Sequence, residues 1–444
     1  MPDPTNRREF LRRSGTLGVA LGALGNVARG ADDPKDDAPA KPNDAPPPQN
    51  VTVGVMGTGG RGTELAVEYA SRPGVTVRYV CDVDATRADR AAAAVAARQD
   101  KESAGPKAVG DFRRILDDKE VDVMVVAAAD HWHAPAAILA CAAGKHVYVE
   151  KPCCHNPHEG ELLVAAARKY KRIVQHGTQR RSWPKNVEAV ELVKSGGIGR
   201  VLFSRGWYNN VRPSIGRGKE GPPPGKLDFA LWQGPAPERP FRDNILHYNW
   251  HWFWHWGTGE CGNNGVHALD VCRWGLGVDY PRRVTAGGGR YYYDDDQETP
   301  DTHSVTYDFG DKGMIVWEGR SCHPRGFEGS GFGIAFYGDA GTVVIDSGGY
   351  KVLDLNGKVT KEDSGPGGNA EHVQNFLDCV RNGGKPNAEI EEGYKSALLC
   401  HLGNIAYRTG RTVNLDPQTH RIAGDAEQQA LWGREYRKGW EPKV

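Results

Sequence analysis

Hydrophobic residues after position 50 change repeatedly between two periods. Residues 51–55 alternate as in a strand, and Leu65 and Tyr69 lie four positions apart, on one face of a following helix. The same patterns place strands at 75–81, 121–128, 146–150 and 172–175, and helices at 88–98, 112–116, 134–143 and 159–170. Strands and helices that alternate at this spacing predict a doubly wound parallel sheet covered on both faces, with a ligand at the carboxyl ends of its strands.

The second half of the chain has short strands that follow one another with turn residues between them. They are expected at 201–207, 282–286, 304–309, 314–318, 334–337 and 342–345, with helices at 372–380 and 394–407. Such a run predicts a largely antiparallel, open sheet. The predicted fold class is therefore α/β, with a parallel-sheet domain at residues 51–178 and an α+β domain at residues 179–444.

The first fifty residues differ from the rest in composition. Arg7 and Arg8 precede a glycine-rich, mildly apolar stretch at residues 15–28, which is shorter than the ~20 residues of a membrane-spanning helix. This arrangement resembles a twin-arginine export signal. We expect a signal peptide at residues 1–31, a disordered linker rich in Asp, Pro and Ala at residues 32–50, and an exported, periplasmic protein.

Charge and cysteine content narrow the function classes. The chain has 56 basic and 56 acidic residues, and this balance argues against nucleic acid or an anionic membrane surface as a partner. Nine cysteines without a repeated spacing argue against a disulfide framework, and we expect them to be buried thiols, with adjacent Cys153 and Cys154 as the candidate exception. A small polar ligand fits this composition.

A glycine turn follows the first predicted strand and precedes the first predicted helix. Between a strand and a helix, this spacing is typical of a Rossmann domain, where it seats a dinucleotide pyrophosphate. The candidate cofactor-binding residues of the turn are Gly57, Gly59, Gly60, Arg61 and Gly62.

The next strand ends at Asp82, about 20 residues further on, where an acidic residue would bind the adenine ribose. A carboxylate there accepts a hydrogen bond from the 2′-hydroxyl and repels a 2′-phosphate. Arg87, the nearest basic residue that follows, is several positions away. We therefore expect NAD as the cofactor in preference to NADP.

Glu150, Lys151 and Pro152 follow the predicted strand at 146–150. This sequence resembles the EKP motif of the glucose-fructose oxidoreductase and inositol dehydrogenase (Gfo/Idh/MocA) family. The resemblance implies that Lys151 reaches a substrate hydroxyl beside the nicotinamide, that Glu150 lies at the cofactor, and that the proline, often after a cis bond, fixes the turn. Independently of the family, a lysine at this end of a strand points into the ligand crevice and can hold a hydroxyl and relay its proton.

His131 and His133 follow the strand at 121–128. In the family this loop approaches the nicotinamide ribose, so both are candidate cofactor contacts. Either residue could equally be a helix cap or a polar residue that fills space.

Residues 256–274 resemble the second signature of the family. His267 and Asp270 lie three positions apart at a helix start, so the carboxylate could orient the imidazole as a general base; a buried histidine satisfied by a neighbouring acid is the alternative. Asn263 stands where many family members carry aspartate, and an amide can only orient the substrate. In this respect the segment is closer to the NAD-dependent glycosidases related to the family.

An aromatic run at residues 248–256 suits a sugar, whose C–H faces stack on rings. We expect Trp250 and Trp254 to contact substrate, together with Arg180, which resembles a family position at the domain junction and could instead be an ion-pair partner. His251 and His255 have the spacing of a helical metal pair, but no third ligand completes a motif, so no metal is expected.

These features predict an NAD-dependent oxidoreductase that transfers hydride between the bound cofactor and a hydroxyl of a sugar or polyol. The first alternative is a redox-neutral NAD-dependent glycosidase that works by oxidation, elimination, addition and reduction. The second, from another class, is a non-catalytic sugar-binding protein. The family resemblance also implies a homo-oligomer, a dimer or tetramer, paired through the open sheet.

Overall fold

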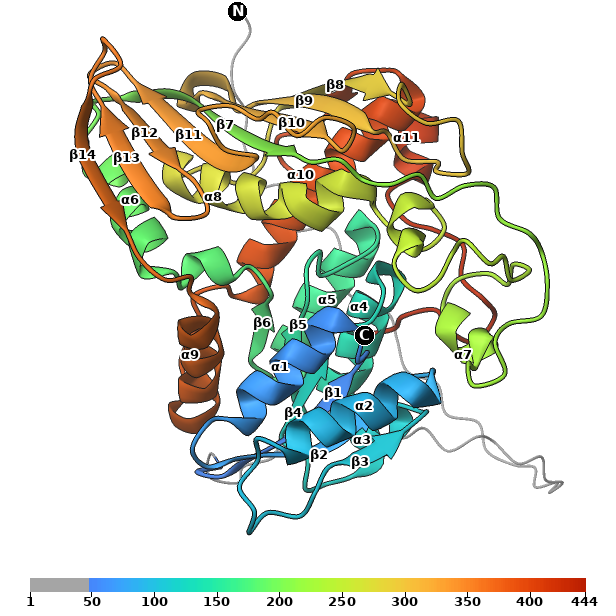
Figure 1. Ribbon diagram of the computed structural model, residues 1–444. Coiled ribbons are helices and arrows are strands. Elements are labelled where there is room, and N and C mark those ends of the chain that lie inside the picture. The colour runs from blue at the N-terminus through green and yellow to red at the C-terminus, as the bar shows by residue number, and fades with distance from the viewer. Residues whose placement is uncertain (1–47) are drawn as a thin grey trace, which may run out of the picture. The chain divides into compact units, whose positions relative to one another are not determined.

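The computed structural model describes residues 48–444, which belong to one compact unit (Figure 1). The predicted signal peptide and nearly all of the predicted linker lie outside these residues. Within them, no helix is both long enough and apolar enough to cross a bilayer.

The first half of this unit is a six-stranded parallel sheet with the order β3-β2-β1-β4-β5-β6, which confirms the predicted Rossmann arrangement. Valine-rich strands suit a sheet that is buried on both faces. The strands are β1 (Val51–Met56), β2 (Val75–Cys81), β3 (Lys107–Val109), β4 (Val123–Val126), β5 (His146–Val149) and β6 (Val174–His176). The helices between them are α1 (Gly60–Ala70), α2 (Ala85–Ala96), α3 (Arg113–Asp117), α4 (Asp130–Ala142) and α5 (Pro157–Lys169).

The second half contains a nine-stranded sheet with the order β14-β13-β12-β11-β7-β10-β9-β8-β15. Every neighbouring pair is antiparallel except β7 and β10, so the predicted largely antiparallel sheet is confirmed. Its strands are β7 (Val201–Asn209), β8 (Arg283–Gly289), β9 (Thr302–Asp308), β10 (Met314–Arg320), β11 (Phe332–Gly338), β12 (Thr342–Ile345), β13 (Gly349–Leu353), β14 (Val359–Ser364) and β15 (Val413–Asn414).

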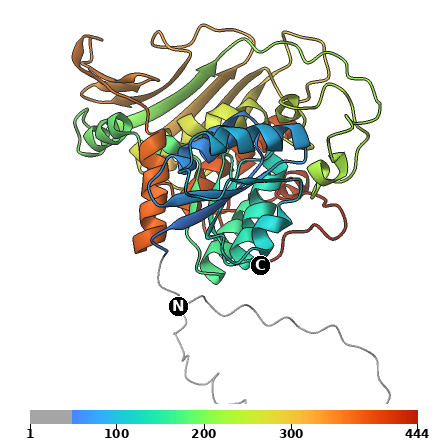
Figure 2. The ribbon, with the colours of Figure 1, turned by 60° about the horizontal axis from the view of Figure 1, so that its bottom comes forward.

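Helices connect the two sheets. The long helix α10 (Ile390–Thr409) contacts β6 of the first sheet and β8 of the second, and α8 (Val266–Leu276) packs on β7 and β11. In Figures 1 and 2, α8, drawn in yellow, lies between the two sheets. A shorter helix, α6 (Pro184–Lys194), packs on α8 and on β12 and β13.

One helix from the C-terminal part of the chain returns to the first sheet. Helix α9 (Asn369–Asn382) places Val373, Phe376 and Leu377 in the same core cluster as the strands β1 and β2. Figure 1 shows α9 beside α1, at the lower left of the molecule. The core of the parallel sheet is therefore completed by residues far from it in the sequence.

The long segment between β7 and α8 reaches across to the parallel sheet. It contains α7 (Phe229–Gln233) and a 3-10 helix (Asn249–Trp252). A bridge joins Leu227 to Asp84, and His247 Nε2 lies 3.2 Å from Asp84 Oδ2. These contacts hold the aromatic run over the carboxyl ends of the parallel strands.

Candidate functional site

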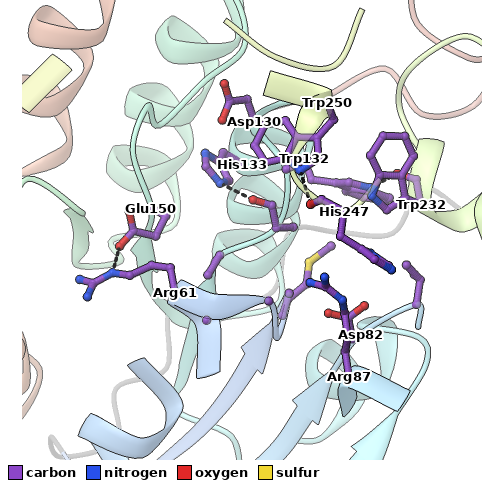
Figure 3. Close-up of a pocket in the computed structure, with 18 of the residues that line it drawn as sticks. Arg61, Asp82, Arg87, Asp130, Trp132, His133, Glu150, Trp232, His247 and Trp250 are labelled. Carbon is purple, nitrogen blue, oxygen red and sulfur yellow. Dashed lines mark hydrogen bonds and ion pairs between the residues drawn. The ribbon is translucent and has the colours of Figure 1, made fainter. Parts of the chain in front are cut away.

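A cavity of about 450 Å³ lies at the carboxyl ends of β1, β2, β4 and β5, where the order of the strands reverses. Ligands of open α/β sheets bind at this position. Its walls come from the parallel sheet on one side and from residues 227–263 on the other (Figure 3).

The glycine turn forms the floor of this cavity and is glycine for steric reasons. Gly57 has a φ of +84°, and a Cβ there would lie 2.5 Å from the backbone nitrogen of Ala128. A Cβ on Gly62 would lie 1.7 Å from the carbonyl oxygen of Gly57, whereas Gly60 has nothing within 4 Å. Helix α1 begins here without a side-chain cap, so its first N–H groups are free to bind a pyrophosphate. A dinucleotide therefore fits the turn.

Arg61 and Glu150, both predicted to bind the cofactor, line the cavity and are paired with each other. The Nε of Arg61 donates to Glu150 Oε1 at 2.8 Å, and one terminal nitrogen donates to Asn369 Oδ1 at 2.7 Å (Figure 3). The guanidinium holds the pKa of the buried Glu150 carboxyl at about 2, against the effect of desolvation. This pair joins α1 to the end of β5.

Asp82 directly follows β2 and lines the cavity, as the spacing predicts. Its Oδ2 accepts a hydrogen bond from the backbone nitrogen of Thr58 at 2.8 Å, which ties the carboxylate to the glycine turn. Arg87, which the sequence suggested was too distant, also lines the cavity, because the first turn of α2 brings it back toward Gly59 (Figure 3). Both a carboxylate and a guanidinium therefore border the predicted ribose position.

Lys151 lies at the cavity wall directly after β5, and its bond to Pro152 is cis. The ammonium donates to Asn263 twice, at 2.6 Å to the carbonyl oxygen and at 3.0 Å to Oδ1. Burial lowers the pKa of Lys151, although Glu150, Asp130 and Glu260 act in the opposite direction. The structure thus brings Lys151 and Asn263, both predicted catalytic residues, into direct contact.

Asn263 belongs to a π-helix (Cys261–Gly265), a distortion found frequently at functional sites. Its Nδ2 lies 3.3 Å from the Tyr248 hydroxyl and 3.4 Å from Glu260 Oε1. Glu260 is paired in turn with Arg212 at 3.2 Å. Tyr248 and Arg212 were not predicted as polar site residues, because only the fold brings these positions to Asn263. Glu260, three positions before Asn263, lies inside the recognised segment and was overlooked.

The predicted pairing of His267 with Asp270 is wrong. Both carboxylate oxygens of Asp270 accept from Arg181 Nε, at 3.0 and 2.9 Å, and Oδ1 also accepts from Ser396 Oγ at 2.7 Å. The Asp270 carboxylate is therefore bound by the buried guanidinium of Arg181, and not by His267 as the spacing had predicted.

His267 itself does not line the cavity. Its Nδ1 is buried without a hydrogen-bond partner among the described residues. Burial, together with the positive charges of Lys151 and Arg180, lowers the pKa of His267 well below 6.5. His267 is therefore neutral and close enough to Lys151 to respond to its charge, but it is not oriented by Asp270.

The two histidines of the loop after β4 differ. His131 is fully buried, and its Nε2 lies 2.9 Å from the carbonyl oxygen of Trp232, so the prediction that it contacts the cofactor is wrong. His133 lines the cavity, with Nδ1 2.6 Å from the carbonyl oxygen of Pro152 and Nε2 2.9 Å from that of Ala128. His133 thus fixes the turn that presents Lys151.

The three residues predicted to contact the substrate lie in three different places. Trp250 lines the cavity and stacks on His251, with ring centroids 3.6 Å apart. Trp254 lies in a different cavity, described below. Arg180 lines neither of these two cavities, because its guanidinium packs 4.2 Å from the Phe332 ring and 5.1 Å from the Trp183 ring.

The described residues contain neither a disulfide nor a group of side chains that could bind a metal ion. All nine cysteines are unpaired and eight are buried; the sulfurs of Cys153 and Cys154 are 4.0 Å apart. Within residues 48–444, no three His, Cys, Asp or Glu side chains gather in a group that could hold a metal ion.

Comparison with known proteins gives two family matches that together span nearly all described residues. Residues 51–178 match the family model described as "Oxidoreductase family, NAD-binding Rossmann fold". Residues 164–442 match the model described as "Oxidoreductase family, C-terminal alpha/beta domain".

Individual relatives match over a shorter length. A glycosyl hydrolase family 109 protein of Saccharopolyspora erythraea is 35% identical over 216 residues, which is 46% of each chain. An inositol 2-dehydrogenase of Salmonella typhimurium is 32% identical over 161 residues, 36% of this chain and 46% of the relative. These matches cover about half of the relatives' length.

Solved structures share the fold over most of the chain. The aldose-aldose oxidoreductase from Caulobacter crescentus, complexed with glycerol, has a TM-score of 0.64 at 19% identity and covers 83% of this chain and 100% of its own. A levoglucosan dehydrogenase in complex with NADH has a TM-score of 0.64 at 18% identity, with 82% and 99% covered. Since the C-terminal model alone matches more than half of the chain, this protein belongs to the Gfo/Idh/MocA oxidoreductase family.

Proposed function

We propose that this protein is an NAD-dependent oxidoreductase that acts on a CH–OH group of a sugar or polyol. The observation that carries the proposal is the position of Lys151. Its half-buried ammonium is held by Asn263 at the wall of the cavity whose floor is the glycine turn. A nicotinamide dinucleotide, when bound, supplies the hydride acceptor and donor.

The residues that would hold the cofactor are the glycine turn, the first N–H groups of α1 and Asp82. The carboxylate of Asp82 offers an acceptor to a ribose hydroxyl and opposes a 2′-phosphate, which favours NAD. Arg87 borders the same position, and its guanidinium would favour NADP if Asp82 were absent. Asp82 is therefore proposed as the residue that makes the protein prefer NAD over NADP.

Lys151 would hold the substrate oxygen and move its proton. Burial favours the neutral amine over the ammonium, so Lys151 gives up and regains a proton more readily than a solvated lysine. Asn263 accepts from Lys151 through Oδ1 and therefore presents Nδ2 toward Tyr248. This fixed amide would place a second hydroxyl of the substrate by hydrogen bonds alone.

The wall opposite the sheet suits the rest of a sugar. Trp250 contributes an aromatic ring, and Tyr248 contributes a ring and a hydroxyl. A sugar ring can place its apolar C–H faces against the Trp250 ring and its hydroxyls near the Tyr248 hydroxyl. The cavity has room for both a nicotinamide end and a small polyhydroxylated ligand.

A redox-neutral glycosidase is the second candidate, and two observations favour it. Asn263 stands where an ionisable acid would serve a net dehydrogenase, and the glycosyl hydrolase family 109 relative is 35% identical over its matched region. In that reaction Lys151 would also take the hydroxyl proton. Elimination of the leaving group, addition of water and return of the hydride would follow.

Export and oligomerisation are proposed on separate grounds. The Arg7 and Arg8 segment supports export to the periplasm, where a cofactor bound before export would have to be regenerated on the enzyme in each cycle. Leu202 and Met314, on the paired strands β7 and β10, are partly exposed, which supports pairing of two copies through the nine-stranded sheet.

The experiment that tests the activity uses the purified full chain with NAD and a panel of sugars, polyols and aryl glycosides. A dehydrogenase produces the absorbance of reduced nicotinamide, whereas a glycosidase releases the aryl alcohol without net change in the cofactor. The Lys151→Met variant is the control and should lose either activity by about 10²-fold or more. If no compound changes either signal although NAD binds, the proposed function is wrong.

A further inference from the structure

A second cavity, of about 470 Å³, lies next to the first. Its lining comes from residues 155–157, 237–239, 254–258, 401–408 and 430–435 together with Glu298, which the fold brings together from six separate segments. The two cavities share a wall: Thr258 lines the second, and its Oγ1 donates to Oδ2 of Asp130, which lines the first, at 2.6 Å. None of the functions proposed above uses this second cavity.

Two guanidinium groups of the second cavity lack a carboxylate partner. Arg408 Cζ lies 5.1 Å above the ring of Trp254. Each nitrogen of the Arg434 guanidinium has one neutral partner: the carbonyl oxygens of Glu435 and His255, at 3.2 and 3.1 Å, and His155 Nδ1, at 3.1 Å. Among residues 48–444, neither guanidinium forms an ion pair. Burial lowers the pKa of both, since Glu298 and Glu159, the nearest opposing charges, do not offset desolvation.

Three acidic residues line this cavity, and two of them, Glu238 and Glu298, have partners, whereas Glu435 forms no ion pair among the described residues. Glu238 is paired with Arg437 at 2.7 Å, and Glu298 accepts from the backbone nitrogen of Trp254 at 2.8 Å. The lining therefore has as many acidic as basic residues, but Arg408 and Arg434 are its two basic side chains without an ion-pair partner among the described residues, and they can bind an anion that enters from solvent. A planar carboxylate can accept two parallel hydrogen bonds from one planar guanidinium.

Neutral groups of the lining suit a polyhydroxylated ligand. Trp254 offers an apolar ring, and Asn404, whose Nδ2 donates to the carbonyl oxygen of Thr258 at 2.8 Å, retains Oδ1 as an acceptor. The volume lies within the range of about 300–1,000 Å³ for small-molecule sites. Trp254 was expected to contact substrate, and the structure places it here instead.

We propose that the second cavity is a binding site for a monosaccharide carboxylate, such as an aldonate or a uronate. The carboxylate pairs with Arg408 and Arg434, and the carbon chain or ring lies against Trp254. The site is separate from Lys151 and does not depend on the function proposed for the first cavity.

Isothermal titration of the full chain with gluconate tests this proposal. We expect saturable binding of one equivalent, and no comparable binding of glucose or of sulfate. Arg408→Gln should weaken gluconate at least tenfold, as expected for the loss of one charge-assisted hydrogen bond. Arg411→Gln is the matched control, because that nearby guanidinium is already paired with Asp425 and Glu427, and it should leave the affinity unchanged.

Two further variants make the outcome decisive. Trp254→Leu should weaken gluconate without removing a charge, and Lys151→Gln, in the first cavity, should leave gluconate binding intact. The proposal is overturned if gluconate does not bind, if glucose or sulfate binds equally well, or if Lys151→Gln removes the binding while Arg408→Gln retains it. Thermal unfolding of each variant establishes that the compared proteins are folded.

Discussion

The choice of cofactor depends on two residues at one end of the cavity. Asp82 hydrogen-bonds the glycine turn, and Arg87 lies beside Gly59. We expect wild type to bind NAD more tightly than NADP. Asp82→Ser should narrow this preference by about tenfold or more, since it removes a charge that repels the 2′-phosphate and leaves the arginine in place.

Fluorescence titration with both cofactors measures these affinities. Arg87→Ala in the Asp82→Ser background should abolish the gain in NADP affinity, whereas Arg90→Ala, on the exposed side of the same helix, should not change it. Equal affinities of Asp82→Ser and wild type for NADP would show that Asp82 does not set the preference.

Most of the predictions from sequence that proved wrong concern the partners or positions of single side chains. The end of a strand is visible in a sequence, and so Lys151 and Asp82 were found, whereas Asn263 was found through the resemblance of residues 256–274 to a family signature. The partner of Asp270 was not, because Arg181 and Ser396 come from distant segments and only the folded chain brings them to the carboxylate. The spacing of residues on a helix shows which side chains share a face. It does not show whether one of those side chains binds a residue from another segment instead of its helix neighbour.

The turn between β1 and α1 depends on close contact between two glycines. A Cβ on Gly62 would lie 1.7 Å from the carbonyl oxygen of Gly57. We expect Gly62→Ala to lower the free energy of unfolding by about 1–3 kcal/mol and to abolish detectable cofactor binding, because the turn must open to admit the methyl group. Urea denaturation and NAD titration measure the two effects.

Gly60→Ala provides the matched control for stability. Nothing lies within 4 Å of a Cβ there, and the residue begins α1, so its free energy of unfolding should stay within about 0.5 kcal/mol of wild type or increase. A stable Gly62→Ala protein that binds NAD normally would contradict the close packing of the turn.

Helix α9 completes the core of the parallel sheet, although it follows that sheet by almost two hundred residues. Phe376 is fully buried among the valines of β1 and β2. Phe376→Ala should therefore cost about 3–5 kcal/mol. Asp378→Ala, on the exposed side of α9, should cost less than about 0.5 kcal/mol. Equal denaturation midpoints for the two variants would show that α9 does not stabilise this core.

Element prediction succeeded where burial leaves a pattern. The strands of the parallel sheet other than β3, and the strands β7 to β12, have clear hydrophobic positions and were expected near their observed bounds; β3 was missed because none of its three residues is buried. Strand β14 was missed because five of its six residues are exposed, which leaves no alternation to detect. Its place in the sheet comes from pairing with β13.

At the scale of the whole molecule, fully buried histidines make stability depend on pH. Burial lowers the pKa to about 3 in His131, His176 and His251, and to about 4 in His372 and His401, from 6.5. Between these values the unfolded chain binds protons that the folded chain does not. Stability is therefore fully present above pH 6.5 and falls as the pH falls, by up to about 1.4 kcal/mol per pH unit for each histidine.

Urea midpoints at pH 7.5, 6 and 5 test this expectation. They should fall steadily, and His372→Gln should reduce the slope, whereas exposed His323→Gln should not. Burial raises the pKa of Asp130 and Glu159, and these two carboxyl groups oppose the trend at pH values below their raised pKa. Midpoints that are constant from pH 7.5 to 5 would contradict the neutral state of these histidines.

In the proposed function, hydride would pass between a sugar carbon and a nicotinamide held above the glycine turn, and Lys151 would take the hydroxyl proton. Mass spectrometry of the cofactor released after incubation with sugars deuterated at their carbinol carbons tests it most directly. The account predicts deuterium in the nicotinamide with wild type, and none with a Lys151→Met protein that still binds NAD. A bound cofactor that gains no deuterium from any sugar or polyol, or gains it equally without the lysine, would contradict the account.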